Sequence, residues 1–320
     1  MSDCFFKSWS EAYLAEQPPR TKSLVMTLFG DVIRPHGGAL WLGSLIRLLA
    51  PFGINDRLVR TSVYRLAEEG WLSAQREGRR SMYTLRPQAS QRFQKAHQRI
   101  YTPTNLAWDG EWTQVFFLSG SISTKQRADL RKALLWEGFG ALSPFAFIHP
   151  NPDLNALNAL IAENHCAQAV YVVQQNSTDI NHTKPLSSLI TECWQLDEVS
   201  QRYTRFIEHF APVLRHLTTH PKPSAEQAFV MRTLLIHEYR RAQLHDPQLP
   251  LELLPKNWSG KKAYEICHQL YQLLLPCSQD YILATLRTED ENAPEADQYF
   301  YERFGGLSKT ATDGVLEQAS

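Results

Sequence analysis

The stretch from Asn55 to Leu85 constrains the fold most, because a capped helix pattern is followed at once by a hairpin pattern. Asn55 and Asp56 suit the N-cap and first turn of a helix, and Gly70 suits the position just beyond its end. Between them, apolar and small residues form one stripe at helical spacing. The stripe consists of Leu58, Val59, Ser62, Val63, Leu66 and Ala67. This spacing predicts an amphipathic helix that packs the stripe inward.

The hairpin pattern begins directly after Gly70. Residues 71–75 and 81–85 have the composition of strands, and the segment between them contains Gly78 and three arginines. With helix patterns at 22–29 and 44–49, this order predicts an N-terminal winged helix-turn-helix. We expect the outer face of the helix and the hairpin tip to contact DNA. The residues concerned are Arg57, Arg60, Thr61, Tyr64, Arg65, Arg76, Arg79 and Arg80.

The charge distribution supports this interpretation. The whole chain carries 33 basic and 33 acidic residues, which argues against a polyanionic partner if it is taken as a single number. Residues 20–99, however, contain 14 basic and 5 acidic residues, a net charge of +9 that the rest of the chain cancels. Twelve of the 14 are arginines, whose planar fork suits phosphates and guanine edges. A solvated basic face, or a winged helix used for protein contacts, would also fit these charges.

The middle of the chain alternates strand and helix patterns. Strands are predicted at 112–118, 140–149 and 169–174, and helices at 125–136 and 154–162. This order predicts a ferredoxin-like α+β domain, although one of the usual four strands is not evident. The polar residues 176–189 are typical of a linker.

The last part of the chain is helical in pattern. Helices are predicted at 196–217, with an interruption at Pro212, and at 224–244 and 262–275. The chain is therefore predicted to be an α+β multidomain protein with a mostly helical C-terminal domain. The predicted parts are an N-terminal arm (1–19), the winged helix with a helical connector (20–100), the ferredoxin-like domain (105–180), the helical domain (190–285) and an acidic tail (286–320).

Several kinds of chemistry lack their residue patterns. His237-Glu238 begins like the zinc motif HExxH, but its fifth position is Arg241, so we expect no metal site. No acid–base pair or nucleophile constellation stands out, so we expect no catalytic residues and no enzyme. The five cysteines form no CxxC pair, which predicts a reduced, cytoplasmic protein, and no apolar run reaches the ~18 residues of a membrane span.

Many segments closely resemble the PaaX family, the phenylacetic acid degradation repressors with a GntR-like winged helix. In the N-terminal part they are residues 41–45, 57–72 and 78–83; further on they are 108–110, 136–144, 192–194, 234–241, 246–255, 258–260 and 303–307. The resemblance therefore covers almost the whole chain. It implies a homodimeric repressor that binds double-stranded operator DNA of phenylacetate catabolic genes and leaves it when phenylacetyl-CoA binds. It implies no other cofactor and no membrane partner.

The same resemblance implies a middle domain like the CRISPR adaptation nuclease. That nuclease needs a carboxylate at the end of its first strand to hold a metal ion. Here the predicted strand ends at Leu118, and the next acidic residue is Asp129. We therefore expect a spacer or dimerisation unit.

The effector pocket is predicted from the chemistry of the ligand. A CoA thioester carries phosphates, so we expect basic and aromatic residues of the C-terminal part around it, with Lys261 and Lys262 as further candidates. The main candidates are His237, Tyr239, Arg240, Arg241, Lys256 and Trp258. A polar network between helices is the alternative for His237 to Arg241. A regulator that responds to another acyl-CoA or aromatic acid, or a winged-helix assembly factor, would share the same sequence features.

Overall fold

The computed structural model describes residues 2–102, 107–118, 120, 122–176 and 185–307. Its contacts divide the chain into two compact units. The first comprises Met1–Pro103, Thr204–Gln243 and Lys261–Ser320, and the second comprises Thr104–Tyr203 and Leu244–Gly260. Helices from the end of the chain therefore share one unit with the N-terminal region.

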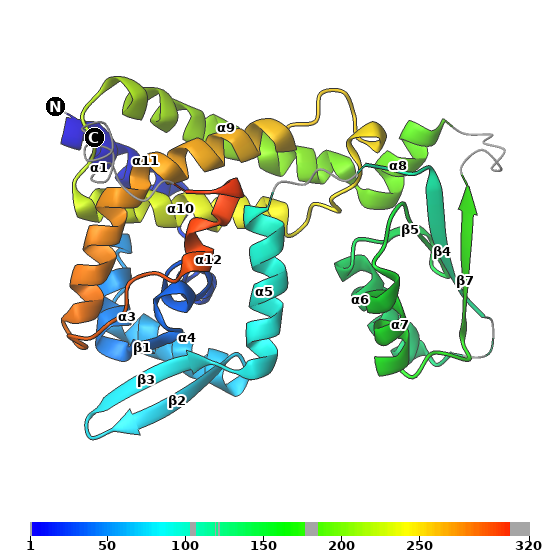
Figure 1. Ribbon diagram of the computed structural model, residues 1–320, viewed down its shortest axis with the longest axis horizontal. Helices are drawn as coiled ribbons and strands as arrows, with labels where there is room; N and C mark the ends of the chain where they lie inside the picture. Colours follow the sequence, from blue (N-terminus) through cyan, green and yellow to red (C-terminus); the bar gives the residue numbers. More distant parts are fainter. Residues whose placement is uncertain (1, 103–106, 119, 121, 177–184, 308–320) are drawn as a thin grey trace, which may run out of the picture. The chain divides into compact units, whose positions relative to one another are not determined.

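The N-terminal part of the first unit combines helices with a small antiparallel sheet in the strand order β1-β3-β2 (Figure 1). Gly78, with a φ of 57°, starts the two-residue connection between β2 and β3, as a tight hairpin requires. The predicted hairpin is thus present. The elements are α1 (Ser2–Glu16), α2 (Thr21–Leu28), β1 (Ala39–Trp41), α3 (Leu42–Leu49), α4 (Asp56–Glu68), β2 (Leu72–Glu77), β3 (Arg80–Leu85) and α5 (Pro87–Tyr101).

The helical part of the first unit surrounds α10 (Ala225–Gln243), which is buried along most of its length and packs against α1, α2 and α5. Its neighbours in the chain are α9 (Leu196–Thr219), of which the residues from Thr204 belong to this unit, and α11 (Gly260–Arg287). The short α12 (Gln298–Tyr301) lies in the segment predicted as an acidic tail, where Phe300 and Phe304 are buried. Asp313 and Glu317 of that tail lie outside the described residues.

Two prolines do not break their helices, so the predicted interruption at Pro212 and the predicted end near residue 275 are wrong. Pro212 lies inside α9, and Pro276 lies inside α11. A proline removes one backbone hydrogen bond. Buried residues continue on both sides of each proline, and their tertiary packing offsets this local cost. They are Phe210, Val213 and Leu217 in α9, and Leu274, Leu275, Ser278 and Ile282 in α11.

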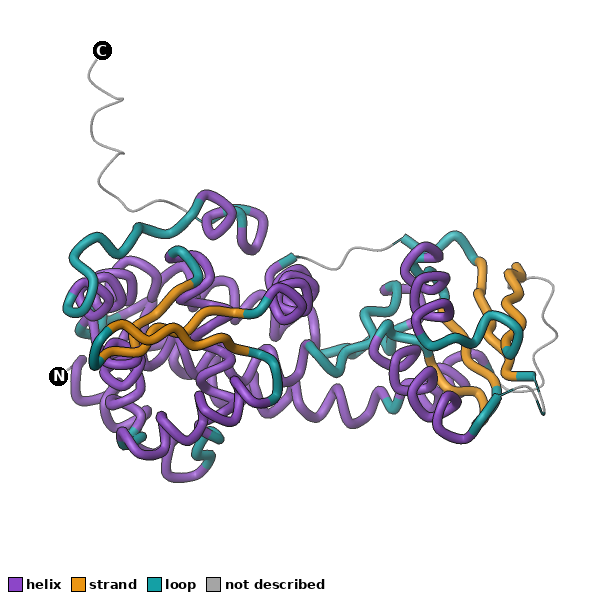
Figure 2. The backbone as a smooth tube through the Cα atoms, turned by 90° about the horizontal axis from the view of Figure 1, so that it is seen from below, coloured by secondary structure: helices purple, strands orange, loops and turns teal. Residues whose placement is uncertain are grey.

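The second unit contains a four-stranded antiparallel sheet in the order β5-β6-β4-β7, with α6 and α7 on one face (Figures 1 and 2). The segment predicted as one strand, 140–149, is two strands joined by a tight turn. This supplies the missing strand and gives the order β-α-β-β-α-β of a ferredoxin-like unit. The elements are β4 (Glu111–Phe117), α6 (Thr124–Trp136), β5 (Gly140–Ser143), β6 (Ala146–His149), α7 (Leu154–Glu163), β7 (Val170–Asn176) and α8 (Leu186–Trp194).

The other face of this sheet is covered by residues that follow the domain in sequence. Trp112 and Ile148 of the sheet pack with Ile190, Leu196 and Leu249. The predicted linker at 176–189 is too long, because α8 already begins at Leu186; residues 177–184 of that linker lie outside the described part.

A search of the described helices for a long apolar stretch that could span a membrane found no candidate.

Candidate nucleic-acid interface

Helix α4 presents one polar face to solvent because its other face is held in the core. The Asn55 side chain caps the helix by accepting a hydrogen bond of 3.0 Å from the Leu58 amide. Val59, Val63 and Leu66 are buried and anchor α4 in the same core as α2 and α3. All five of the predicted DNA-contacting residues on this helix are exposed: Arg57, Arg60, Thr61, Tyr64 and Arg65.

The predicted stripe is wrong at one position, because Leu58 is 48% exposed. Leu58 and Val59 are adjacent, so about 100° of helix separates their side chains. The core reaches Val59 and the residues one turn on, but it does not extend round to Leu58. Leu58 therefore lies on the polar face, one turn before Thr61.

The arginines of this region divide into those with partners and those without. Arg60 forms an ion pair of 2.7 Å with Asp56 one turn earlier, and Arg76 donates to the Gly78 carbonyl at 3.3 Å. For Arg57, Arg65 and Arg79, no partner is found among the described residues. These three exposed guanidinium groups are the ones most available to an anionic ligand.

Arg80 differs from the other hairpin arginines although it is exposed as predicted. Its guanidinium lies over the Trp41 ring, 4.3 Å from the centroid, and donates a hydrogen bond of 3.1 Å to the Glu289 carbonyl. It thus connects β3 to β1 and to the segment that follows α11. This geometry fits a residue that holds the hairpin in place.

The acidic segment after α11 is seated against α3 and β3 rather than on α4. The Glu289 carboxylate pairs with Arg47 at 3.1 Å, and Arg47 also donates to the Thr288 hydroxyl. A Cβ at Gly43 would lie 2.5 Å from the Glu289 carboxylate, so a larger residue there would require the Glu289 side chain to shift. The Asp297 amide donates to the Pro35 carbonyl at 2.9 Å. The outer face of α4 stays uncovered by these contacts.

A buried charge cluster joins the N-terminal region to the helical part of the same unit. Asp31, only 2% exposed, lies in a π-helical turn (Phe29–Ile33) after α2. Its carboxylate accepts hydrogen bonds from Tyr101 at 2.6 Å, Tyr271 at 2.8 Å and Arg303 at 2.9 Å, and it forms an ion pair of 3.0 Å with Arg232. Burial alone would raise the pKa of Asp31, but the two guanidinium groups and two hydroxyls hold it below its usual value.

Directly after Arg303, which belongs to this cluster, the backbone takes an uncommon conformation. Phe304 takes a φ of 57°, which is uncommon for a bulky residue, and two glycines with positive φ follow it. The Arg303 guanidinium also donates to the Gly30 carbonyl at 3.3 Å and to His97 Nε2 at 3.2 Å. The segment predicted as an acidic tail thus contributes a buried cation to the centre of the unit. Nothing in the local sequence pattern around Asp31, Arg232 or Arg303 indicates this meeting.

Four of the predicted effector residues lie on α10, where most are enclosed. His237 is hydrogen-bonded through Nδ1 to the Thr27 hydroxyl at 2.9 Å, and Arg240 donates to Ser23 Oγ at 3.0 Å. Tyr239 is buried, 5.4 Å from the Phe206 ring. Arg241 is exposed and donates to Glu238 at 2.6 Å. His237 and Arg240 therefore connect α10 to α2.

The other two effector candidates belong to the second unit. Lys256 is exposed, and the Trp258 ring packs edge-on against Tyr203 at 5.8 Å. The Tyr203 hydroxyl in turn donates to Asp246 at 2.6 Å. The assignment of all six residues to an effector stays a prediction.

The buried state of His237 predicts a pH dependence of stability. Burial first, and then the charges of Arg240 and Arg241, lowers the pKa of His237 to about 3, whereas the pKa of an unfolded histidine is about 6.5. Below about pH 6.5, His237 therefore binds a proton in the unfolded chain but stays neutral in the folded chain. Its contribution to the free energy of unfolding is fully present above about pH 6.5. It falls by about 1.4 kcal/mol for each pH unit below that, until about pH 3.

Urea unfolding of the parent and of His237→Asn between pH 4.5 and 7.5 measures this slope. The variant should show a shallower decline. Some decline remains because burial and Arg303 also lower the pKa of His97 to about 3. Equal slopes for parent and variant would contradict the interpretation.

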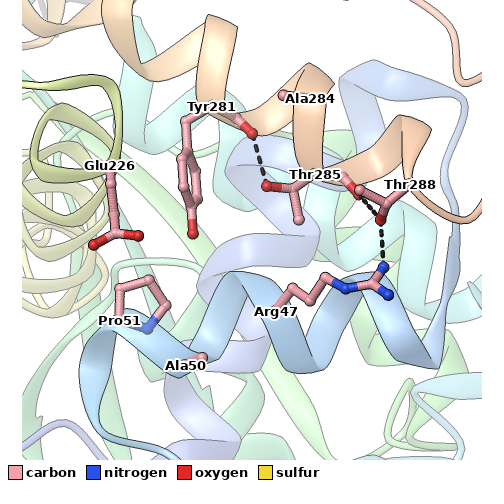
Figure 3. A pocket seen from close by; sticks show the side chains of 8 residues that line it. All are labelled: Arg47, Ala50, Pro51, Glu226, Tyr281, Ala284, Thr285 and Thr288. Carbon is pink, nitrogen blue, oxygen red and sulfur yellow. Dashed lines mark hydrogen bonds between the residues drawn. The ribbon is translucent and has the colours of Figure 1, made fainter.

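A hollow of about 620 Å³ lies in the first unit and is lined by residues of α3, α10 and α11 and of the turn after α3 (Figure 3). The residues that line it include Arg47, Pro51, Glu226, Tyr281 and Thr288, none of which is a site residue predicted from the sequence. Its polar groups are engaged with one another, as the contacts of Arg47 with Thr288 and of Thr285 with the Tyr281 carbonyl show. The hollow therefore offers a ligand space but no unpaired set of polar groups.

The fold and the exposed arginines define a multidomain α+β protein with a basic face on α4 and the β2–β3 hairpin. Sequence models of protein families match residues 20–89 (PaaX-like protein), 105–186 (PaaX protein central Cas2-like domain) and 194–284 (PaaX-like protein C-terminal domain). The chain is 36% identical over 292 residues to the transcriptional repressor PaaX of Escherichia coli strain K12, covering 91% of this chain and 92% of that one. The chain belongs to the PaaX family, which confirms the resemblance and the expectation that it is not an enzyme.

A solved structure shares the fold. An uncharacterized protein from Mycobacterium tuberculosis, Rv0674, superposes with a TM-score of 0.51 at 22% identity, covering 82% of this chain and 97% of that one. At this identity the likeness concerns the fold alone.

Proposed function

We propose that the chain is a DNA-binding transcriptional repressor of phenylacetate catabolic genes and that phenylacetyl-CoA releases it from its operator. The observation that carries the proposal is the position of the eight predicted DNA-contacting residues. All of them are exposed on the outer face of α4 or on the adjoining hairpin, in a chain whose relative is a repressor. On the opposite face of α4, Val59, Ser62, Val63 and Leu66 are buried.

The N-terminal part acts as a winged helix-turn-helix in this proposal. Helices α3 and α4 form the helix-turn-helix, and the β2–β3 hairpin is the wing. The exposed face of α4 lies in the major groove, where Arg57, Thr61 and Arg65 reach base edges. Arg79 at the wing tip contacts phosphate or the minor groove. Arg80 orients the wing through Trp41 and Glu289.

Release requires that phenylacetyl-CoA bind better to a state that fits the operator poorly. Two copies in a homodimer would place their α4 helices one turn of duplex apart, about 34–36 Å. A hundredfold preference for the released state corresponds to about 2.7 kcal/mol. The contacts of His237 with Thr27 and of Arg240 with Ser23 link α10 directly to α2. A movement of α10 would therefore also displace α2 in the DNA-binding part. Another acyl-CoA or aromatic acid would act through the same contacts, and a ligand screen separates these effectors.

The free guanidinium of Arg79 predicts how the wing contributes. Arg79→Ala should weaken binding to every duplex by a similar factor, because a phosphate contact carries no sequence information. It should also reduce the slope of log K against log salt by about 1. Fluorescence anisotropy across a salt series measures both quantities.

The control for this experiment is Arg205→Ala, since Arg205 is an exposed arginine on α9 away from α4 and the hairpin. It should leave the affinity and the salt slope close to those of the parent. An Arg79→Ala variant with an unchanged salt slope would remove the wing from the proposed interface.

A further inference from the structure

The first unit exposes very few large apolar side chains. Among its described residues, only Leu58 and Tyr64 are large hydrophobic residues with high exposure, at 48% and 62%. Both lie on α4, and both are on the face that carries the arginines. A single exposed leucine is ordinary on a protein surface. Here, however, the unit buries its large apolar residues elsewhere and leaves these two on one helix face.

The backbone places Leu58 firmly at the start of α4. Its amide donates to the capping side chain of Asn55, and the next residue, Val59, is fully buried. Leu58 thus belongs to the first turn and a half of the helix. In a helix that enters the major groove, the N-terminal residues are those that reach base edges.

The neighbours of Leu58 restrict what could cover it. Arg57 precedes it, and Thr61 and Arg65 lie one and two turns further along the same face. A partner must therefore be anionic and also present a small apolar group between its charges. Duplex DNA meets both conditions, because the major groove exposes the 5-methyl group of thymine among phosphates and polar base edges.

We propose that Leu58 is a specificity residue that packs against the 5-methyl group of one thymine in the operator half-site. The inference rests on the proposed DNA binding and adds to it a base that the arginines cannot select. Burying one methyl group corresponds to about a fourfold change in affinity.

The test replaces thymine by uracil, which removes the methyl group and keeps the base pair. A duplex that the full chain selects from a random pool is resynthesised with one thymine at a time replaced. For the parent, we expect about a fourfold loss at one position, or at two symmetry-related positions, and little change at the others. Leu58→Ala should bind the thymine and uracil duplexes equally.

The control is Leu251→Ala, the same substitution at an exposed leucine far from α4 in sequence. It should keep the preference of the parent for thymine. If the parent binds DNA but shows no position sensitive to the methyl group, or if Leu58→Ala keeps the same thymine preference, the inference is overturned while the proposed function stands. Unchanged DNA binding in Leu58→Ala would instead favour a protein partner for this residue. A parent that selects no duplex at all overturns the proposed function and this inference together.

Discussion

Asp31→Asn is expected to destabilise the chain by about 3–5 kcal/mol. Among the described residues, the Asp31 carboxylate is the one anion that pairs with two buried guanidinium groups, those of Arg232 and Arg303. Asparagine keeps the shape and an acceptor oxygen but removes the charge, so two buried cations remain without compensation. Urea unfolding followed by tryptophan fluorescence measures the loss as a lower midpoint of the transition.

In this cluster one carboxylate faces two guanidinium groups, so the loss of a cation should cost less stability than the loss of the anion. Arg303→Met removes one of the two cations and leaves Asp31 paired with Arg232, so it should cost less than Asp31→Asn. Arg241→Met is the matched control, because Arg241 is exposed in its pair with Glu238, and exposed pairs are worth about 0–1 kcal/mol. If Asp31→Asn were no more harmful than Arg241→Met, the cluster would not hold the unit together.

The largest expected effect on DNA binding comes from the two free guanidinium groups of α4. The double variant Arg57→Ala with Arg65→Ala should lose about 2–6 kcal/mol of binding free energy, since each good base contact of this kind is worth about 1–3 kcal/mol. Neither side chain has a partner within the described protein, so their removal leaves the folded state undisturbed. Titration of a labelled operator duplex at fixed salt measures the loss.

Two comparisons make this result specific. The double variant should approach the affinity of the parent for unrelated duplexes, because phosphate contacts by other residues persist. The thermal midpoint should stay within the range of the parent, which excludes unfolding as the cause. Equal operator affinity for the double variant and the parent would contradict the assignment of α4 to DNA.

Local signals were sufficient to predict the exposed basic face of α4 and the hairpin, which we propose to bind DNA. The cap at Asn55, the glycines at 70 and 78 and the stripe from Val59 to Leu66 are each determined by nearby residues, and the structure contains the helix and hairpin that they predict. The error at Leu58 came from the width of the stripe. Periodicity shows which residues share a face, but the depth of the core decides where that face ends.

The features that could not be predicted from the sequence depend on tertiary contacts. Asp31, Arg232 and Arg303 are separated by up to 272 residues, so no spacing rule could bring them together. Pro276 remains inside α11 because buried residues continue beyond it. The effector candidates on α10 were chosen for charge and aromatic character, and the structure shows that charge can equally serve to connect α10 to α2.

The contacts of α10 suggest why ligand and DNA could influence each other. Helices α2 and α10 share two polar contacts, one buried and one partly buried, and the cluster around Asp31 joins the turn after α2 to α11 and to the segment after α12. Charged and hydrogen-bonded groups of this kind tolerate few intermediate positions, since a displaced partner is left unsatisfied. A ligand that shifts one of these helices would therefore also move the part of the unit that we propose to bind DNA.

The most direct test of this account is a release titration with the full chain. The chain is bound to a labelled duplex from upstream of phenylacetate catabolic genes at physiological salt, and phenylacetyl-CoA, CoA and phenylacetate are added separately. We expect tight binding to this duplex, weaker binding to an unrelated one, and release by phenylacetyl-CoA alone. Binding that is equal for both duplexes, or that phenylacetyl-CoA leaves unchanged, would contradict the account.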